Sequence, residues 1–146
     1  MKSSGLLRAT AALILALLMI SMYQDDRKER VHNCASKAGD GAIYLKEFVV
    51  SLPKADKGER PPMYRQAVIL RGNNIYRFNV CNDKGKATIR VYDTANMLLS
   101  SYDQKTGKEH NPINFLCRKT GQYIIVMTIQ DGKAGEAVGI MSHIMK

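Results

Sequence analysis

The stretch from Thr120 to Ile129 constrains the fold more than any other part of the chain. Gly121 opens it as a turn residue, β-branched and aromatic side chains follow, and Gln130 to Lys133 closes it, which is typical of a strand and a tight turn. Its apolar side chains alternate onto two faces, with Tyr123, Ile125, Met127 and Ile129 on one and Ile124 and Val126 on the other. A strand that is apolar on both faces is expected inside a sandwich and not at a sheet edge.

The N-terminus has the pattern of a secretory leader. Met1 to Arg8 carries two positive charges, and Ala9 to Ile20 is a run of 12 residues without charge or proline. Such a run is short for a membrane span. We expect a signal peptide over residues 1–23 or, because no Ala-x-Ala cleavage pattern follows, an uncleaved anchor. The protein is therefore predicted to be periplasmic or secreted, and membrane-anchored if the leader is not cleaved.

Two further parts follow the leader. Residues 24–40 are polar and of mixed charge, which favours a linker that is mobile up to Cys34. Residues 41–146 are enough for one domain with a single core. Within them, short strands alternate with turn residues at a spacing of about 8 to 12 residues, the pattern of an all-β sandwich.

Eight strands are predicted, and no helix after the leader. They are Gly41–Leu52, Gln66–Arg71, Ile75–Cys81, Lys86–Asp93, Met97–Tyr102, Ile113–Cys117, Tyr123–Ile129 and Ala137–Ile144. A short helix over Ile43–Phe48 is the alternative for the first. In the third, Tyr76, Phe78 and Val80 are expected to face the core.

Three of these strands carry a family resemblance. The runs Ile75–Val80, Thr88–Asp93 and Thr120–Val126 contain a Tyr-x-Phe-x-Val strand and a later Thr-Gly-x-Tyr turn and strand. In this the chain resembles the bacterial pre-peptidase C-terminal domain family, and it is similar to small secreted proteins of Bacteroidetes-type bacteria. The resemblance covers Arg65–Ile144 and implies an eight-stranded jelly-roll-like β-sandwich. Ile89-Arg90-Val91 stands where relatives carry an acidic pair, so a calcium role is not implied.

The cysteines are Cys34, Cys81 and Cys117, and outside the cytoplasm three thiols favour one disulfide with one left over. A jelly roll places its first, eighth, third and sixth strands side by side in one sheet. Cys117 then ends the sixth strand at the rim where the first strand begins, just after Cys34. Cys81 ends the third strand at the opposite rim, about 20 Å away. The topology therefore predicts a Cys34–Cys117 disulfide and a free Cys81.

The net charge of +9 indicates anionic partners. Without Lys2 and Arg8, 20 basic residues remain against 13 acidic ones. They are scattered through turns, which is not the pattern of nucleic-acid binding. Lys54, Lys57 and Arg60, in the proline-containing loop before the second strand, are the candidate contact with an anionic surface. An envelope protein, a polysaccharide and an anionic membrane surface are the possible partners.

No catalytic or metal constellation is predicted, and no cofactor. His32, His110 and His143 lie far apart in the sequence, and Lys105 interrupts the alternate oxygens that calcium would need in Asp103–Glu109. His143 is expected to face solvent, and a Cys117–His110 pair lacks a third orienting group. The sequence therefore favours a non-enzymatic binding or accessory module at the cell envelope. A structural subunit of an envelope assembly, held by an uncleaved leader, and a small hydrolase are the alternatives.

Overall fold

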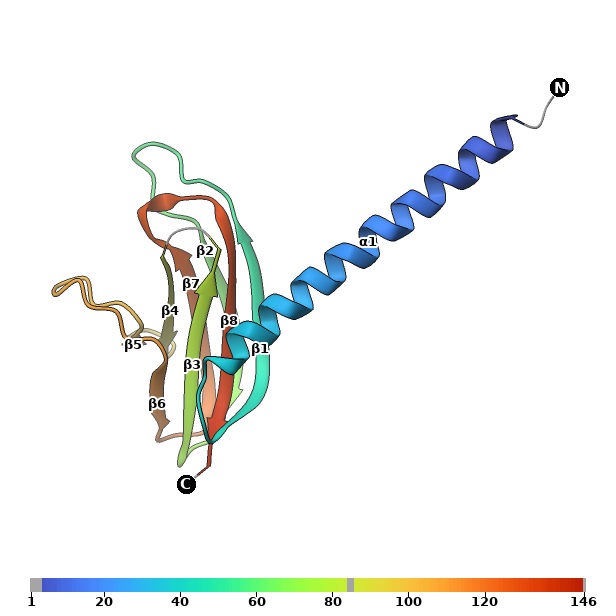
Figure 1. The fold of residues 1–146 in the computed structure, drawn as a ribbon. Helices are drawn as coiled ribbons and strands as arrows, with labels where there is room; N and C mark the ends of the chain where they lie inside the picture. Colours follow the sequence, from blue (N-terminus) through green and yellow to red (C-terminus); the bar gives the residue numbers. More distant parts are fainter. Residues whose placement is uncertain (1–3, 84–85, 146) are drawn as a thin grey trace.

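The structure is a computed structural model that describes residues 4–83 and 86–145. The start of the predicted leader, Met1 to Ser3, and Lys84 and Gly85 between the third and fourth strands lie outside it. One long helix precedes eight strands (Figure 1). The elements are α1 (Ser4–Ser36), β1 (Ala42–Leu52), β2 (Met63–Leu70), β3 (Asn74–Asn82), β4 (Ala87–Tyr92), β5 (Met97–Ser100), β6 (Ile113–Cys117), β7 (Gly121–Ile129), a 3-10 turn (Gln130–Gly132) and β8 (Gly135–Ile144).

The strands form two four-stranded sheets in which all neighbours are antiparallel. Sheet A has the order β1-β8-β3-β6 and sheet B the order β2-β7-β4-β5. The β-sandwich and the predicted order of first, eighth, third and sixth strands are thereby confirmed. Strand β7, apolar on both faces, lies between β2 and β4 and not at an edge. Strand β1 is extended throughout with a bulge between Tyr44 and Lys46, so the alternative of a helix over Ile43–Phe48 is wrong.

The core fills the space between the sheets with alternate side chains from both. Tyr76, Phe78 and Val80 of β3 point inward as predicted. The largest buried side chains opposite them include Ile89, Ile125 and Met127, each fully buried. Because every second residue of each inner strand contributes, the two-layer packing follows from the alternation in the sequence.

Helix α1 is continuous from the apolar leader into the polar stretch behind it. Residues 24–36, predicted as part of a mobile linker, are helical, and their end packs on the outer face of sheet A. Val31 and Ala35 there cover Val138 and Ile140 of β8. This contact explains why the segment is helical and not a mobile linker. An isolated polar helix is barely stable in water, whereas a helix that buries apolar side chains against a sheet is stabilised by that packing.

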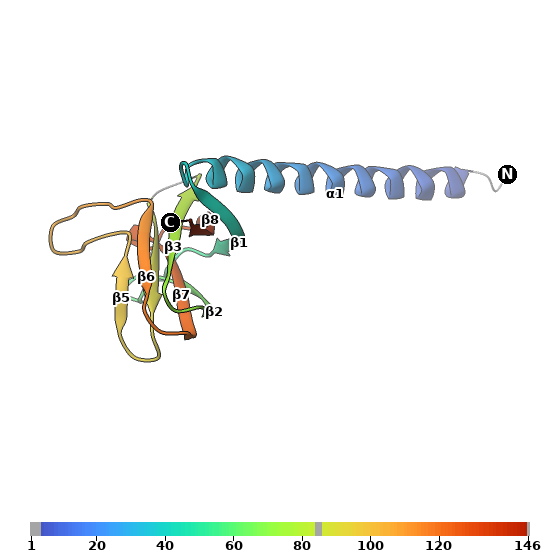
Figure 2. The same cartoon turned by 90° about the horizontal axis from the view of Figure 1, so that it is seen from below.

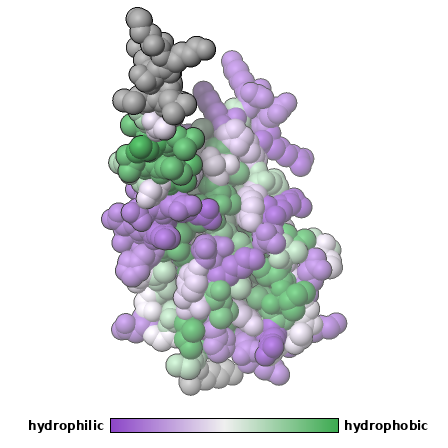
Figure 3. All heavy atoms as spheres, turned by 90° about the vertical axis from the view of Figure 1, so that its right-hand side faces the viewer, coloured by the Kyte–Doolittle hydropathy of each residue, from purple (hydrophilic) through white to green (hydrophobic). Residues whose placement is uncertain are grey.

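The apolar part of α1 projects away from the sandwich (Figures 1 and 2). Its side chains are exposed, among them Leu13, Leu17 and Met22. Figure 3, which looks at the molecule from the side toward which the helix projects, shows a green patch at the upper left with purple residues below it. None of the helices in residues 4–83 and 86–145 reaches the length and apolarity that crossing a membrane requires.

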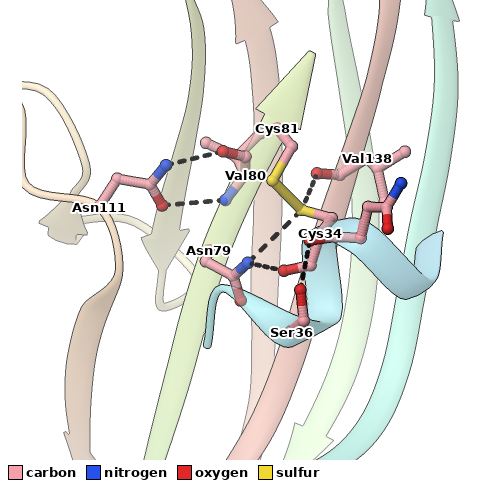
Figure 4. Close-up of a disulfide and its surroundings, with 8 residues drawn as sticks. Cys34, Ser36, Asn79, Val80, Cys81, Asn111 and Val138 are labelled. Atoms are coloured by element: carbon pink, nitrogen blue, oxygen red, sulfur yellow. Dashed lines mark hydrogen bonds between the residues drawn. A yellow bond between two sulfur atoms is a disulfide. The ribbon is translucent and has the colours of Figure 1, made fainter. Parts of the chain in front are cut away.

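The disulfide joins Cys34 to Cys81, and the predicted Cys34–Cys117 pairing is wrong (Figure 4). Cys117 and Cys81 lie at opposite rims of sheet A, as predicted. Cys117 pairs in register with Asn74 at the start of β3, and Cys81 lies at the far end of that strand. The error lies in Cys34. Cys34 lies beside Val138 of β8, whereas β1 begins beside Ile144, six residues further along β8. Cys34 and the start of β1 are therefore about 20 Å apart, and residues 35–41 cover this distance along the outer face of sheet A.

The faces of the sheet also exclude the predicted pairing. Cys81 follows the inward-facing Val80 and therefore points outward, toward helix α1. Cys117 points inward, is fully buried and belongs to the core. A bridge between Cys34 and Cys117 would have to cross the sheet.

Candidate functional site

The outer faces of the two sheets differ in what covers them. On sheet A, the end of α1 and the residues that connect it to β1 cover Val138, Ile140 and Ser142, which are at most 5% exposed. On sheet B, no helix or strand of the described part of the chain packs against the outer face (Figure 2). We call this outer face of sheet B the open face.

Apolar side chains form a row across the open face. Ala67, Ile124, Tyr92 and Met97 lie opposite one another in register across all four strands. Met97 is 54% exposed, and Ile69, the next outward residue on β2, is 69% exposed. A single exposed apolar residue is ordinary, but a row of them on an uncovered sheet marks an interaction surface.

Two arginines border this row. Arg65 and Arg90 lie on either side of Val126 in the adjacent register, and Val126 is only 3% exposed although it points outward. The long arginine side chains can cover it with their stems while the guanidinium groups stay at the surface. Among the described residues, ion pairs occur at Arg30–Glu136 and Lys86–Glu109, and neither Arg65 nor Arg90 takes part in one.

A protruding loop stands beside the open face, seen at the left of Figure 1 after β5. We call residues Tyr102–Glu109 the side loop. Its base is closed by an antiparallel β-bridge between Tyr102 and Glu109 and by a 2.9 Å hydrogen bond from Asp103 N to Lys108 O. Below the base, the Asn111 side chain bonds both main-chain groups of Val80.

Asp103 holds the tip of the side loop. Its carboxylate accepts hydrogen bonds of 2.8 Å from the Thr106 hydroxyl and from the main-chain N–H of Lys105. The bond from Thr106, followed by that from Lys105, lowers the pKa of this exposed carboxyl. Asp103 is therefore occupied with donors of its own loop, in the manner of an Asx turn.

Two adjoining grooves run between the side loop and the open face. One, of about 460 Å³, is lined by residues that include Tyr92, Met97 and Lys105. The other, of about 330 Å³, reaches over β2 and β7 to Arg60 and Met63. Both are lined by Arg90, Tyr102 and Gln104, so they meet there.

A larger groove of about 660 Å³ lies where α1 diverges from β1. Arg27, Lys28 and His32 of the helix face Tyr44 and Glu47 of the strand across it. It opens because the helix leaves the sheet at an angle, and its charges are mixed. It therefore indicates a binding surface less clearly than the open face does.

The structure brings one of the three predicted basic residues to this site. Lys54, Lys57 and Arg60 are all exposed, and Arg60 lines the smaller groove on sheet B. Sequence reasoning missed Arg65, Arg90 and the apolar row. The signal for the apolar row is the second apolar face of the Thr120–Ile129 stretch, which on its own predicts only burial inside the sandwich.

The titratable residues considered for chemistry are dispersed. Cys117 is buried, and its Sγ lies 3.3 Å from Lys119 O and 3.6 Å from the Tyr123 hydroxyl, whereas His110 is exposed. The hydrogen bond with Cys117 raises the pKa of Tyr123. His143, expected in solvent, is partly buried and lies 3.1 Å from the side-chain oxygen of Asn74. The described residues contain no group of three or more His, Cys, Asp or Glu that could hold a metal ion.

Two solved structures are similar to this one. Aeromonas hydrophila PliG, a periplasmic lysozyme inhibitor of g-type lysozyme, aligns with a TM-score of 0.51 and 10% identity, covering 72% of this chain and 90% of PliG. The pre-peptidase C-terminal domain of a Bacillus anthracis collagenase aligns with a TM-score of 0.49 and 16% identity, covering 68% of this chain and 89% of that domain. The chain thus shares the fold of PliG. No family model and no curated protein sequence matches the chain.

Proposed function

We propose that this protein is a non-enzymatic binding or accessory module of the periplasm or cell surface, and that it binds a protein partner through the open face of sheet B. The observation that carries the proposal is the apolar row of the open face, bordered by Arg65 and Arg90. Tyrosine, methionine and arginine are the residue types enriched in protein interfaces. Neither arginine pairs with a carboxylate within the described part of the chain, which favours an acidic partner surface.

Further observations support a binding role over catalysis. Cys117 is buried away from solvent and has no histidine among its partners. Each groove of sheet B is lined by a single carboxylate, Asp103 in one and Asp131 in the other, among apolar, aromatic, cationic and neutral polar side chains. PliG provides a precedent for a fold of this kind in a periplasmic inhibitor of a lysozyme, so g-type lysozyme is a rational first partner to assay.

The placement outside the cytoplasm rests on the leader and the disulfide. Disulfides persist in oxidising compartments and are rare in reducing ones. An N-terminal apolar helix with basic residues before it is the pattern of export.

Site-specific photo-crosslinking in the native envelope tests the proposal. A photoreactive residue at Ile69 or Met97 on the open face should link to a discrete protein, and the link should be lost when Arg65 and Arg90 are both replaced by Glu. Leu116 is a matched control because it is 50% exposed but lies on the outer side of sheet A. Equal linking from Leu116, or links from Ile69 and Met97 only to lipid or to a second copy of the chain, would contradict the proposal.

A second candidate is a structural subunit of an envelope assembly that keeps its leader. The observation in its favour is that the apolar part of α1 projects away from the sandwich while the same helix is fastened to sheet A by the disulfide. Mass spectrometry of the N-terminus separates the two. An N-terminus near residue 22 favours the accessory module, and an intact leader favours the subunit.

A further inference from the structure

The two grooves on the open face form one continuous channel with a distinct chemistry. They meet at Arg90, Tyr102 and Gln104 and run from Met97 on β5 to Met63 on β2. We propose that this channel binds an extended, acidic segment of a partner protein, with acidic residues alternating with apolar ones. The inference rests on the proposed function and narrows it, since it names the form and the charge of what the open face recognises.

The dimensions fit an extended chain. Met97 and Met63 lie on the two edge strands of sheet B, three strand spacings apart. The register also sets them four residues apart along the strands, because Met97 lies opposite Tyr92 whereas Met63 is in line with Thr88. At about 4.8 Å per spacing and about 3.4 Å per residue the channel spans about 20 Å, the length of about six extended residues.

The charges select an acidic segment. Arg60, Arg90 and Lys105 line the channel along its length. Asp103 and Asp131 also line it, so three cations face two carboxylates and the channel keeps one net positive charge. Arg90 lines both grooves, so it is the cation that an acidic side chain in the middle of the channel would reach.

The remaining lining is mixed and suits a peptide. Met63, Met97 and Pro61 offer apolar contacts, and the lining also carries hydrogen-bonding side chains that a peptide main chain can use, Ser100, Gln104, Thr128 and Gln130. Tyr92 and Tyr102 add flat rings with a polar tip, which suit alternating apolar and acidic side chains.

One wall of the channel is formed in advance of binding. The side loop is closed at its base by the Tyr102–Glu109 bridge, and Glu109 also pairs with Lys86 at 3.4 Å. Asp103 orders the tip through Lys105 and Thr106. A wall that is already ordered loses little conformational entropy when a ligand enters, which favours binding of a short segment.

Methionine-methyl NMR on the full chain tests the inference. The probe is the blocked hexapeptide Glu-Leu-Glu-Leu-Glu-Leu, and the expected result is selective shifts of the Met63 and Met97 methyl signals with a Kd on the order of 0.1 to 1 mM. The buried Met127 and Met141 serve as internal references. Replacing Arg60 and Arg90 by Gln should weaken binding about tenfold, since each removes a charge-assisted contact.

Matched controls define the outcomes. Arg27→Gln, in the groove beside α1, should leave peptide binding unchanged. The peptide Lys-Leu-Lys-Leu-Lys-Leu should not bind. Equal binding of the lysine peptide, tighter binding of a hexameric galacturonate, or no shift of Met63 and Met97 would overturn the inference. If crosslinks from Met97 to a protein persist while the acidic peptide fails, only this inference fails and the proposed function stands.

Discussion

Cys34 and Cys81 fasten the last turn of helix α1 to the outer face of strand β3, with their Cα atoms 5.8 Å apart (Figure 4). The bridge closes a loop of 47 residues that contains β1, β2 and most of β3. It also places the end of α1 over Val138 and Ile140. The disulfide therefore holds the end of the helix in the position where it covers the outer face of sheet A.

We predict that Cys81→Ser lowers the free energy of unfolding by about 4 kcal/mol, because a loop of this length loses that much unfolded-state entropy when it is closed. Urea denaturation measures the change, and dithiothreitol should reproduce it in the wild-type protein. Cys117→Ala is the control, and it should keep the sensitivity to dithiothreitol. Non-reducing peptide mapping that finds Cys117 in a disulfide would contradict the prediction.

Asn79 reinforces the same junction. It is 1% exposed, and its side-chain amide donates a 2.7 Å hydrogen bond to Cys34 O at the end of the helix. We expect Asn79→Ala to destabilise the protein by about 1 to 2 kcal/mol, because the buried carbonyl loses its donor. Asn114→Ala, at an exposed amide on β6, should change the stability by less than about 0.5 kcal/mol. Equal unfolding midpoints for the two variants would show that the bond does not stabilise the junction.

The architecture of the sandwich was largely predictable because strand alternation and turn residues are local signals. Tyr76, Phe78 and Val80 were assigned to the core from period-two spacing alone, and the sheet order followed from the jelly-roll topology. The position of Cys34 was not predictable in this way. It depends on a tertiary contact between a polar helix end and the outer face of a sheet, which leaves no pattern within either segment.

The candidate site was predictable only in part for a related reason. Arg60 was singled out because a charged loop next to prolines must lie at the surface. Arg90 and Met97 lie on different strands, and only the register of β4 with its neighbours places them on one face. A property shared by side chains from four strands is not visible in any one of them.

Gly139 limits the packing between the sheets. A Cβ at this position would lie 2.8 Å from Met127 Sδ and 3.3 Å from Ile89 Cδ1. Because both neighbours are fully buried, Gly139→Ala should destabilise the protein by about 1 to 2 kcal/mol through overpacking. Gly121→Ala is the control, since its Cβ would meet nothing within 4 Å. A thermal melt compares the two, and an unchanged midpoint for Gly139→Ala would contradict the close contact.

The order of the side loop should depend on pH through Asp103. Hydrogen bonds to its carboxylate lower the pKa in the folded protein, so their contribution is complete above the unfolded-state pKa of about 3.9. It is lost as the pH falls through the lower folded-state pKa. Amide relaxation of Lys105 and Thr106 should therefore show a rigid loop at neutral pH and greater motion near pH 2. In Asp103→Asn, which cannot ionise, this difference should disappear. A loop equally rigid at both pH values in the wild type would count against the role of Asp103.

The loop that carries Lys54, Lys57 and Arg60 is predicted to strengthen attachment to anionic membranes. It is held beside the turn after β7 by a 2.8 Å hydrogen bond from Ala55 N to Gly132 O, and all three basic side chains are exposed. Replacing the three by Ser should weaken binding to vesicles that contain anionic lipid, and the difference should be larger at low salt because the attraction between exposed charges is screened.

The matched control removes the same charge elsewhere, through Lys28→Ser, Lys37→Ser and Lys119→Ser, which are exposed positions away from this loop. If net charge alone governs attachment, both triple variants lose affinity equally in a sedimentation assay. If the loop is the contact, only the variant that lacks Lys54, Lys57 and Arg60 loses affinity for the vesicles. The assay also separates the loop from the channel of sheet B, because Arg90→Gln leaves the loop intact and should not change vesicle binding.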